Sequence, residues 1–288
     1  MKQLFISLRP RQWIKNMFLF AGILFSRHFF DLPFLGIVAS AFVVFCILSG
    51  AIYLLNDIID IEKDKKHPVK SLRPIAAGLL SVDNAIRAFC LLTAVALGIS
   101  FGLGIPFFLT ALAYFVLQVS YSLLLKKIVI LDVFAIASGF VLRVIAGAVV
   151  ISVVISPWLI ICTILLSLFL GLSKRRHEIE TLEGSGHSHR AVLANYSTYL
   201  LDQMIGVVTA SAVVCYALYT MAPETVARFH THNLLFTIPF VLYGIFRYLF
   251  LIHKKGEGGN PETVLTTDLP LLIDIVLWAV TAGLIIYR

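Results

Sequence analysis

The sequence predicts an all-α, polytopic membrane bundle of nine transmembrane helices, and three observations support this fold class. Of the 288 residues, 59% are hydrophobic, and the mean hydropathy is +0.94. Only 14% are charged, against about 25% in a typical soluble domain. The apolar residues occur in runs of roughly 20, the length that crosses a bilayer as a helix. A water-soluble globule, a disordered chain and a coiled coil are therefore excluded.

The expected spans follow one another along the chain and predict one domain over residues 1–288, with a central cavity that faces the cytoplasm. The first span is short and follows an interfacial segment, residues 1–13. Two pairs of spans have almost no loop between them, at Gly104 and between Ser152 and Pro157, which indicates tight hairpins. The nine expected spans are residues 14–29, 34–56, 83–103, 105–124, 131–150, 156–173, 200–222, 234–252 and 268–287.

The longer connections lie on the same expected side of the bundle as the N-terminus. Of the 23 Lys and Arg residues, seventeen lie on this side, three on the opposite side, and three within or at the edge of spans. Because cytoplasmic loops are enriched in Lys and Arg, we expect this side to be cytoplasmic, in a prokaryotic inner membrane. The net charge of +7 is thus a topology signal and a source of anion contacts, and it does not indicate a nucleic-acid partner. The expected cytoplasmic loops are residues 57–82, 125–130, 174–199 and 253–267.

The strongest chemical signal lies at the end of the second span, where three aspartates share one helical face. Asp57, Asp60 and Asp64 have the spacing i, i+3, i+7. Carboxylates on one face repel each other, and Mg²⁺ prefers hard oxygen ligands that it shares with a substrate's phosphates. The motif therefore predicts a Mg²⁺ site, with Asn56 beside it. The structural alternative is a solvated helix end whose acids pair with the lysines between them.

Two ionisable side chains are expected within spans. Arg143 follows Asp132 by eleven residues, so helical geometry places it on the same face and about 16 Å deeper. A guanidinium at that depth indicates either a contact with a substrate phosphate or a buried ion pair with an acid. Asp274, in the ninth span, is either a functional group or the structural partner of Arg247.

These motifs resemble those of the UbiA-type intramembrane transferase superfamily. The matching segments are RPRQWIKN from Arg9, YLLNDxxDxxxDxxHPxKxxRPIAAG from Tyr53, YSxxLKKxxxLDV from Tyr121 and SGFVLRVIAGA from Ser138. Together they most resemble the decaprenyl-phosphate phosphoribosyltransferase branch, densely over residues 9 to about 180. The resemblance implies a nine-helix bundle that binds a Mg²⁺–diphosphate substrate at the cytoplasmic side and opens laterally to membrane lipid.

The implied reaction transfers 5-phosphoribose from phosphoribosyl diphosphate to a polyprenyl phosphate and releases diphosphate. The alternative is a prenyltransferase that moves an isoprenoid from its diphosphate to an aromatic or glycerol-type acceptor. Typical prenyltransferases of the superfamily carry two aspartate-rich motifs, whereas residues 120–132 keep one acid, Asp132, and contain Tyr121 and Lys126. This difference favours the phosphoribosyl reaction, because lysines bind phosphate and not metal. A transporter is disfavoured, because most polar residues gather at the cytoplasmic end. A homo-oligomer is compatible with these features.

The resemblance also implies roles for individual residues. Asp57, Asp60 and Asp64 are the expected Mg²⁺ ligands, and the expected catalytic residues are Asp57, Asp60, Tyr121 and Lys126. Because the acceptor phosphate is already anionic, no strong general base is expected, and positioning should dominate catalysis. The residues expected to bind substrate are Lys15, Asn56, Lys70, Arg73, Asp132, Arg143, Lys174 and Arg175.

Overall fold

The computed structural model describes residues 2–183, 193, 195–255, 263–264 and 267–287. These residues form helices and contain no strand, which confirms the all-α fold class. They fall into two compact units, Met1–Ile155 and Ser156–Arg288, and each unit is described by itself. Within the described ranges, eight helices are long and apolar enough to cross a membrane.

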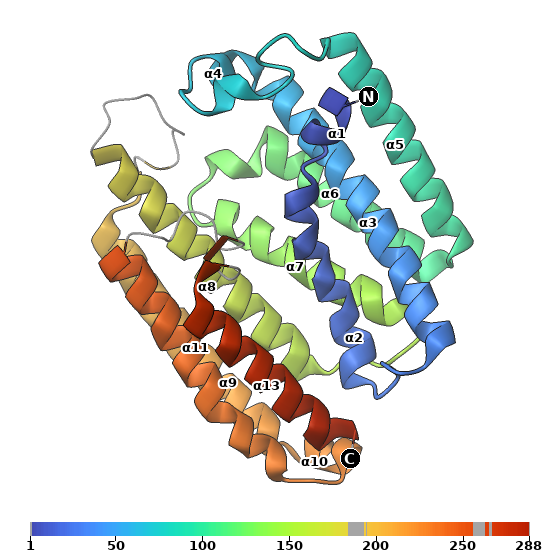
Figure 1. Ribbon diagram of the computed structural model, residues 1–288, viewed down its shortest axis with the longest axis vertical. Helices are drawn as coiled ribbons and strands as arrows, with labels where there is room; N and C mark the ends of the chain where they lie inside the picture. Colours follow the sequence, from blue (N-terminus) through green and yellow to red (C-terminus); the bar gives the residue numbers. More distant parts are fainter. Residues whose placement is uncertain (1, 184–192, 194, 256–262, 265–266, 288) are drawn as a thin grey trace. The chain divides into compact units, whose positions relative to one another are not determined.

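The first unit is built on four long helices that lie side by side in Figure 1. α3 packs against α5, α6 and α7, and α6 also packs against α5 and α7. The hairpin expected at Gly104 joins α5 to α6, and its glycine has φ 120°, a backbone conformation that other residues rarely adopt. The long helices are α3 (Leu32–Ile59), α5 (Val82–Gly102), α6 (Ile105–Leu123) and α7 (Leu131–Val149). The shorter helices are α1 (Lys2–Ser7), η1 (Pro10–Leu19), α2 (Phe20–Phe25), α4 (Ile61–Lys65), η2 (Lys70–Leu72) and η3 (Leu125–Lys127).

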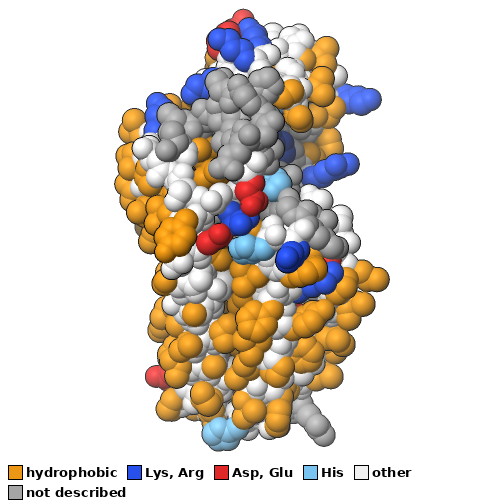
Figure 2. Space-filling model, turned by 90° about the vertical axis from the view of Figure 1, so that its left-hand side faces the viewer, with side chains coloured by type: hydrophobic (Ala, Val, Ile, Leu, Met, Phe, Trp, Pro, Cys, Tyr) orange, Lys and Arg blue, Asp and Glu red, His pale blue; other side chains and the backbone are white. Residues whose placement is uncertain are grey.

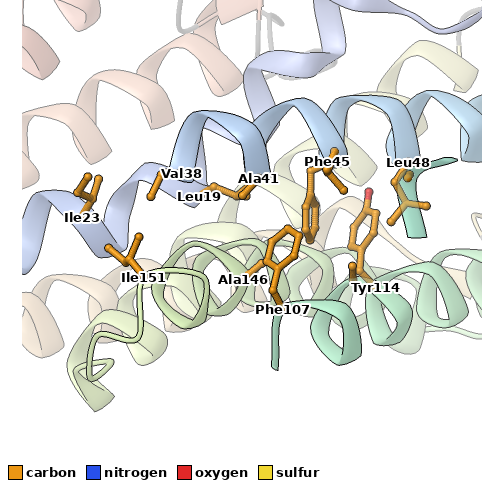
Figure 3. Packing of buried hydrophobic residues seen from close by; sticks show 13 residues of the cluster. Leu19, Ile23, Val38, Ala41, Phe45, Leu48, Phe107, Tyr114, Ala146 and Ile151 are labelled. Atoms are coloured by element: carbon orange, nitrogen blue, oxygen red, sulfur yellow. The ribbon is translucent and has the colours of Figure 1, made fainter. Parts of the chain in front are cut away.

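Aromatic side chains hold α3 against α6 in the core of this unit. The ring of Phe45 lies 5.0 Å from the ring of Tyr114 and 5.9 Å from that of Phe107, measured between centroids. Figure 3 shows these three rings together, with Leu48 of α3 beside them. All four residues are at most 2% exposed, so the packing fixes the position of α3.

The first expected span, residues 14–29, does not form one continuous α-helix. The region instead contains the ten-residue 3₁₀-helix η1, which starts four residues before the expected span, and the six-residue α2, which ends four residues before the expected end. Both lie along α7, and η1 also lies along α3 (Figure 1). Because a 3₁₀-helix rises about 2.0 Å per residue and an α-helix about 1.5 Å, the two extend about 29 Å, close to the thickness of a hydrocarbon core. Eight of the nine expected spans are thus found among the long helices of the described residues. A ninth crossing, through η1 and α2, stays a prediction.

The second unit contains the other four long helices, one of which combines η5, α11 and η6 in a single span, Asn233–Lys254. α8 packs against α9, and α11 packs against both α9 and α13. α8 continues beyond the expected span to Glu183, so the loop expected at 174–199 begins as helix; other parts of this loop and of the loop expected at 253–267 lie outside the described residues. Ion pairs one turn apart, such as Arg176–Glu180 at 2.6 Å, stabilise this extension. The helices are α8 (Pro157–Glu183), α9 (Thr198–Met221), α10 (Pro223–Phe229), η5 (Asn233–Thr237), α11 (Ile238–Phe250), η6 (Leu251–Lys255) and α13 (Leu269–Tyr287).

Arg247 does not pair with Asp274, the structural alternative considered for that acid. Its Nε and Nη2 donate to the two carboxylate oxygens of Asp268 at 3.0 and 2.8 Å. Asp268 stands directly before α13 and also accepts a hydrogen bond from the backbone N–H of Leu271 at 3.0 Å. The helix start therefore places this carboxylate where Arg247 can reach it. Asp274 is buried on α13, with its Oδ2 close to Gly244 of α11.

Large apolar side chains on the surface agree with a multi-pass membrane protein. Hydrophobic side chains cover much of the face shown in Figure 2. Phe246 of α11 and Leu284 of α13 are 62% and 67% exposed, and Phe101 of α5 is 64% exposed. A soluble monomer rarely exposes apolar patches on this scale, whereas lipid covers them without cost.

Candidate active site

Three segments far apart in the sequence meet at the end of α3 through ion pairs. The segment after α1 contributes an arginine, the loop after α4 contributes another, and η3 contributes a lysine. Each of the three predicted aspartates is paired with at least one of these cations. The ion-pair cluster consists of Asp57, Asp60, Asp64, Arg9, Arg73 and Lys126.

Asp57 and Asp64 share one guanidinium nitrogen. Nη1 of Arg73 lies 3.1 Å from Oδ1 of Asp57 and 2.5 Å from Oδ2 of Asp64, so these two oxygens lie within two hydrogen-bond lengths of each other. Asp57 is 2% exposed and Asp64 is 4% exposed. A buried carboxylate costs several kcal/mol unless it is paired. The structure therefore brings two of the predicted metal ligands to one point and balances their charge there.

Asp60 has a different partner. Its two oxygens accept hydrogen bonds from Nζ of Lys126 at 3.0 and 2.8 Å, across 66 residues of sequence. α3 ends at Ile59 and α4 begins at Ile61, so Asp60 is the joint between two helices and not part of one continuous face. The break turns its carboxylate toward η3 while Asp57 and Asp64 face Arg73.

The lysines between the aspartates do not pair with them in the described contacts, contrary to the alternative of a solvated helix end. Lys65 instead donates to Glu62 at 2.8 Å. This hydrogen bond is the main cause that lowers the pKa of the exposed Glu62. Glu62 thus belongs to a local surface pair and is not a member of the ion-pair cluster.

Arg9, which the sequence shows only as the first residue of the RPRQWIKN segment, is a member of the ion-pair cluster. Its guanidinium donates to Asp57 and lies over the ring of Tyr53, 4.8 Å from the ring centroid. Its backbone has φ 52°, in the left-handed region that a residue with a side chain seldom adopts. Such backbone strain is concentrated at functional sites, where the surrounding contacts hold it. The pairing across 48 residues has no signal in sequence spacing.

The residues of the cluster fit Mg²⁺ in number and chemistry. Carboxylate oxygens are the hard ligands that Mg²⁺ takes, and it commonly uses one or two of them together with water and substrate phosphates. Asp57 and Asp64 already share one cationic group, Nη1 of Arg73. Within the described ranges, no three His, Cys, Asp or Glu side chains gather closely enough to hold a metal. The three-ligand set with Asp60 therefore stays a prediction.

Arg143 occupies a second polar centre in the first unit. Its Nε donates to Oδ1 of Asn16 at 2.8 Å, its Nη1 to the carbonyl of Gly139 at 2.9 Å and its Nη2 to the hydroxyl of Tyr114 at 2.8 Å. The guanidinium also lies 5.4 Å from the centroid of the Phe140 ring. Arg143 is 6% exposed, and all these acceptors are neutral. The alternative of an ion pair with an acid is therefore not realised among the described residues.

The remaining predicted residues are distributed over both units. Lys15 lies on η1, Asn56 on α3, Lys70 at the start of η2 and Tyr121 on α6. Asp132 is fully buried at the start of α7. The residues in the second unit are Lys174 and Arg175 of α8, of which Arg175 is 1% exposed and donates to Glu178 at 2.5 Å.

Comparison with known sequences decides the family. Residues 16–262, which include most of the ion-pair cluster, match the UbiA prenyltransferase family. The chain belongs to this family. As a UbiA protein, it is an enzyme with a multi-pass membrane fold, as its apolar helices predict.

Among its relatives, a decaprenyl-phosphate phosphoribosyltransferase of Mycolicibacterium smegmatis is 33% identical, and the match covers 98% of this chain and 91% of that protein. A protein of the same name from Corynebacterium glutamicum is 34% identical over 98% of this chain and 86% of that protein. The fold resembles that of a UbiA homologue from Archaeoglobus fulgidus, solved with GPP and Mg²⁺, with a TM-score of 0.73 at 18% identity over 99% of this chain and 100% of that one.

Proposed function

We propose that this UbiA protein transfers 5-phosphoribose from phosphoribosyl diphosphate to a polyprenyl phosphate, depends on Mg²⁺, and releases diphosphate. The ion-pair cluster carries the proposal, because three cations accompany three carboxylates at the end of α3. The donor brings a diphosphate and a 5-phosphate, and the acceptor brings a further phosphate. Reactants with this much negative charge need cationic side chains in addition to a metal. The names of the two bacterial relatives support the same activity.

In this reaction the bond between C1 of the ribose and the diphosphate oxygen breaks, and the diphosphate leaves with the electron pair. A phosphate oxygen of the polyprenyl phosphate forms the new bond to C1. Mg²⁺ supplies stabilisation of the negative charge that grows on the diphosphate. Asp57 and Asp64 are the residues that would hold it, with Asp60 close by in sequence as the third predicted ligand.

The other side chains of the site bind and orient the two anionic substrates, phosphoribosyl diphosphate and polyprenyl phosphate. Lys126 comes from the segment where the second acidic motif is missing, and it is 9% exposed, so a phosphate that meets its ammonium group is largely shielded from water. Tyr121 lies two residues before the end of α6 and is assigned to the same role. The acceptor phosphate is already anionic, so holding it near C1 supplies most of the rate. The further anion contacts that we assign are Lys15, Lys70, Arg73, Arg143, Lys174 and Arg175, with Asn56 and Asp132 as polar positioning residues.

Incubation of the purified protein with phosphoribosyl diphosphate, a polyprenyl phosphate and Mg²⁺ tests the proposal. Mass spectrometry should detect a lipid-linked phosphoribose, and its formation should stop when EDTA removes the metal. Asp57→Asn should not form the product, whereas the matched surface variant Glu62→Gln should form it at the wild-type rate. Failure to form this product, together with turnover of a prenyl diphosphate and an aromatic or glycerol-type acceptor, would identify the protein as a prenyltransferase.

A further inference from the structure

Two of the three cations in the ion-pair cluster, Arg9 and Arg73, are more exposed than the aspartates with which they pair. The side chains of Arg9 and Arg73 are 28% and 26% exposed, whereas those of Asp57 and Asp64 are 2% and 6% exposed. The two arginines thus lie between solvent and two buried carboxylates. A ligand that reaches these carboxylates must therefore first meet the arginines.

The third pair has a different exposure but the same chemistry. Lys126 is buried more deeply than Asp60, with side-chain exposures of 10% and 26%. Its ammonium group contacts both oxygens of Asp60, at 3.0 and 2.8 Å. No carboxylate oxygen of Asp60 is therefore without a cationic contact. A metal cation could bind to Asp60 only if Lys126 moved away, or if the repulsion between the metal and the ammonium group were offset by other charges.

The same cations are good phosphate ligands. A guanidinium binds phosphate oxygens through paired N–H groups, and an ammonium binds them as a point charge. A carboxylate, in contrast, repels phosphate and binds a divalent cation. In a complex of a divalent cation with diphosphate, the metal can pair with the aspartates and the diphosphate oxygens can pair with Arg9, Arg73 and Lys126. If these pairs replace the ones between the aspartates and the cations, no charged side chain is left without a partner.

We propose that Arg9, Arg73 and Lys126 are exchangeable counter-ions, which pair with the three aspartates before substrate binds and with diphosphate oxygens afterwards. Arg9 thereby becomes a further substrate-binding residue, held in place by its left-handed backbone and by the ring of Tyr53. Because a metal ion alone offers the cations no phosphate, the protein binds it weakly. The divalent cation and the diphosphate therefore bind together as one unit. This inference rests on the proposed function only in that the donor carries a diphosphate.

Binding measurements without turnover test the exchange. Mn²⁺ binding to the purified protein is measured by electron paramagnetic resonance, and binding of inorganic diphosphate in saturating Mg²⁺ is measured by calorimetry. Lys126→Met should bind Mn²⁺ alone about tenfold more tightly than the wild type, and should bind Mg²⁺–diphosphate about tenfold more weakly. Lys127→Met, on the same short helix and exposed, should change neither affinity.

Arg9→Gln provides an independent test at Asp57, in case Lys126→Met does not fold. It should change the two affinities in the same opposite directions, and Arg11→Gln, an exposed neighbour, should change neither. If both affinities fall in the Arg9 and Lys126 variants, the cations have a structural role and do not exchange partners, and the proposal is wrong. If Mn²⁺ binding stays at the wild-type value while diphosphate binding falls, the cations do not compete with the metal, and the proposal is equally wrong. Both probes lack ribose and lipid, so a different donor or acceptor leaves this test intact.

Discussion

Gly147→Ala is expected to destabilise the protein, because α7 and η1 approach each other more closely than a methyl group allows. A Cβ atom added to Gly147 would lie 2.6 Å from the carbonyl carbon of Leu19 and 2.8 Å from its Cα. These are backbone atoms, which cannot rotate away as a side chain can. η1 must therefore shift, or α7 must bend.

The expected size of the effect follows from two opposing contributions. Overpacking of a core costs about 1–3 kcal/mol, and a clash with backbone belongs at the upper end of that range. Alanine is favoured over glycine within a helix by about 1 kcal/mol, which offsets part of this cost. We expect a net loss of about 2 kcal/mol. At roughly 2–4 °C for each kcal/mol in a chain of this size, the melting temperature should fall by about 4–8 °C.

Thermal unfolding of the purified protein in detergent measures this change. Gly98→Ala is the matched control, because a Cβ atom at this α5 position would meet nothing within 4 Å and should raise the melting temperature slightly. Gly147→Ala should also lower turnover, since η1 carries Lys15 and Asn16. Equal melting temperatures for the two variants would show that η1 does not dock tightly on α7 in solution.

Three further experiments test other contacts. Asp60→Asn should leave the melting temperature within a few degrees of the wild-type value but lower Mg²⁺-dependent turnover by about 10²-fold or more, measured as diphosphate release; near-normal turnover would refute its role as a ligand. Arg143→Met should destabilise the fold by about 2–4 kcal/mol, because it leaves buried acceptors without a donor, whereas the exposed Arg87→Met should change the unfolding free energy by less than about 0.5 kcal/mol. A double-mutant cycle of Arg247→Met and Asp268→Asn should give a coupling energy of about 1–3 kcal/mol in thermal unfolding, and a value near zero would show that their bidentate contact is not formed.

Features encoded in local sequence were predicted well. Long apolar runs predicted helices such as α3 and α13, and the tight hairpin at Gly104 followed from the absence of loop residues between two such runs. The three aspartates could be recognised as a group because their i, i+3, i+7 spacing can be judged within a single helix, without knowledge of the tertiary fold. The break at Asp60 was not predicted, because neither proline nor glycine stands there and the lysine that pairs with Asp60 lies 66 residues away.

Features that depend on tertiary packing were beyond sequence reasoning. The hydropathy of an apolar run does not distinguish an α-helix from a 3₁₀-helix. The 3₁₀-helix η1 lies in close contact with α7, for example between Leu19 and Gly147. The partner of Arg247 could not be predicted from sequence, because Asp268 reaches it only through the packing of α11 against α13; Asp268 also caps the start of α13. Arg9 gave no spacing signal, because its pairing with Asp57 requires α1 and α3 to be packed first.

A competition between donors is the most direct test of the proposed reaction. The purified protein is given equal concentrations of phosphoribosyl diphosphate and a prenyl diphosphate, with polyprenyl phosphate, an aromatic acceptor and Mg²⁺ present, and all lipid products are quantified by mass spectrometry. The ion-pair cluster, with Lys126 in the segment that lacks a second acidic motif, predicts that lipid-linked phosphoribose is the dominant product. A prenylated acceptor formed without any lipid-linked phosphoribose would contradict it.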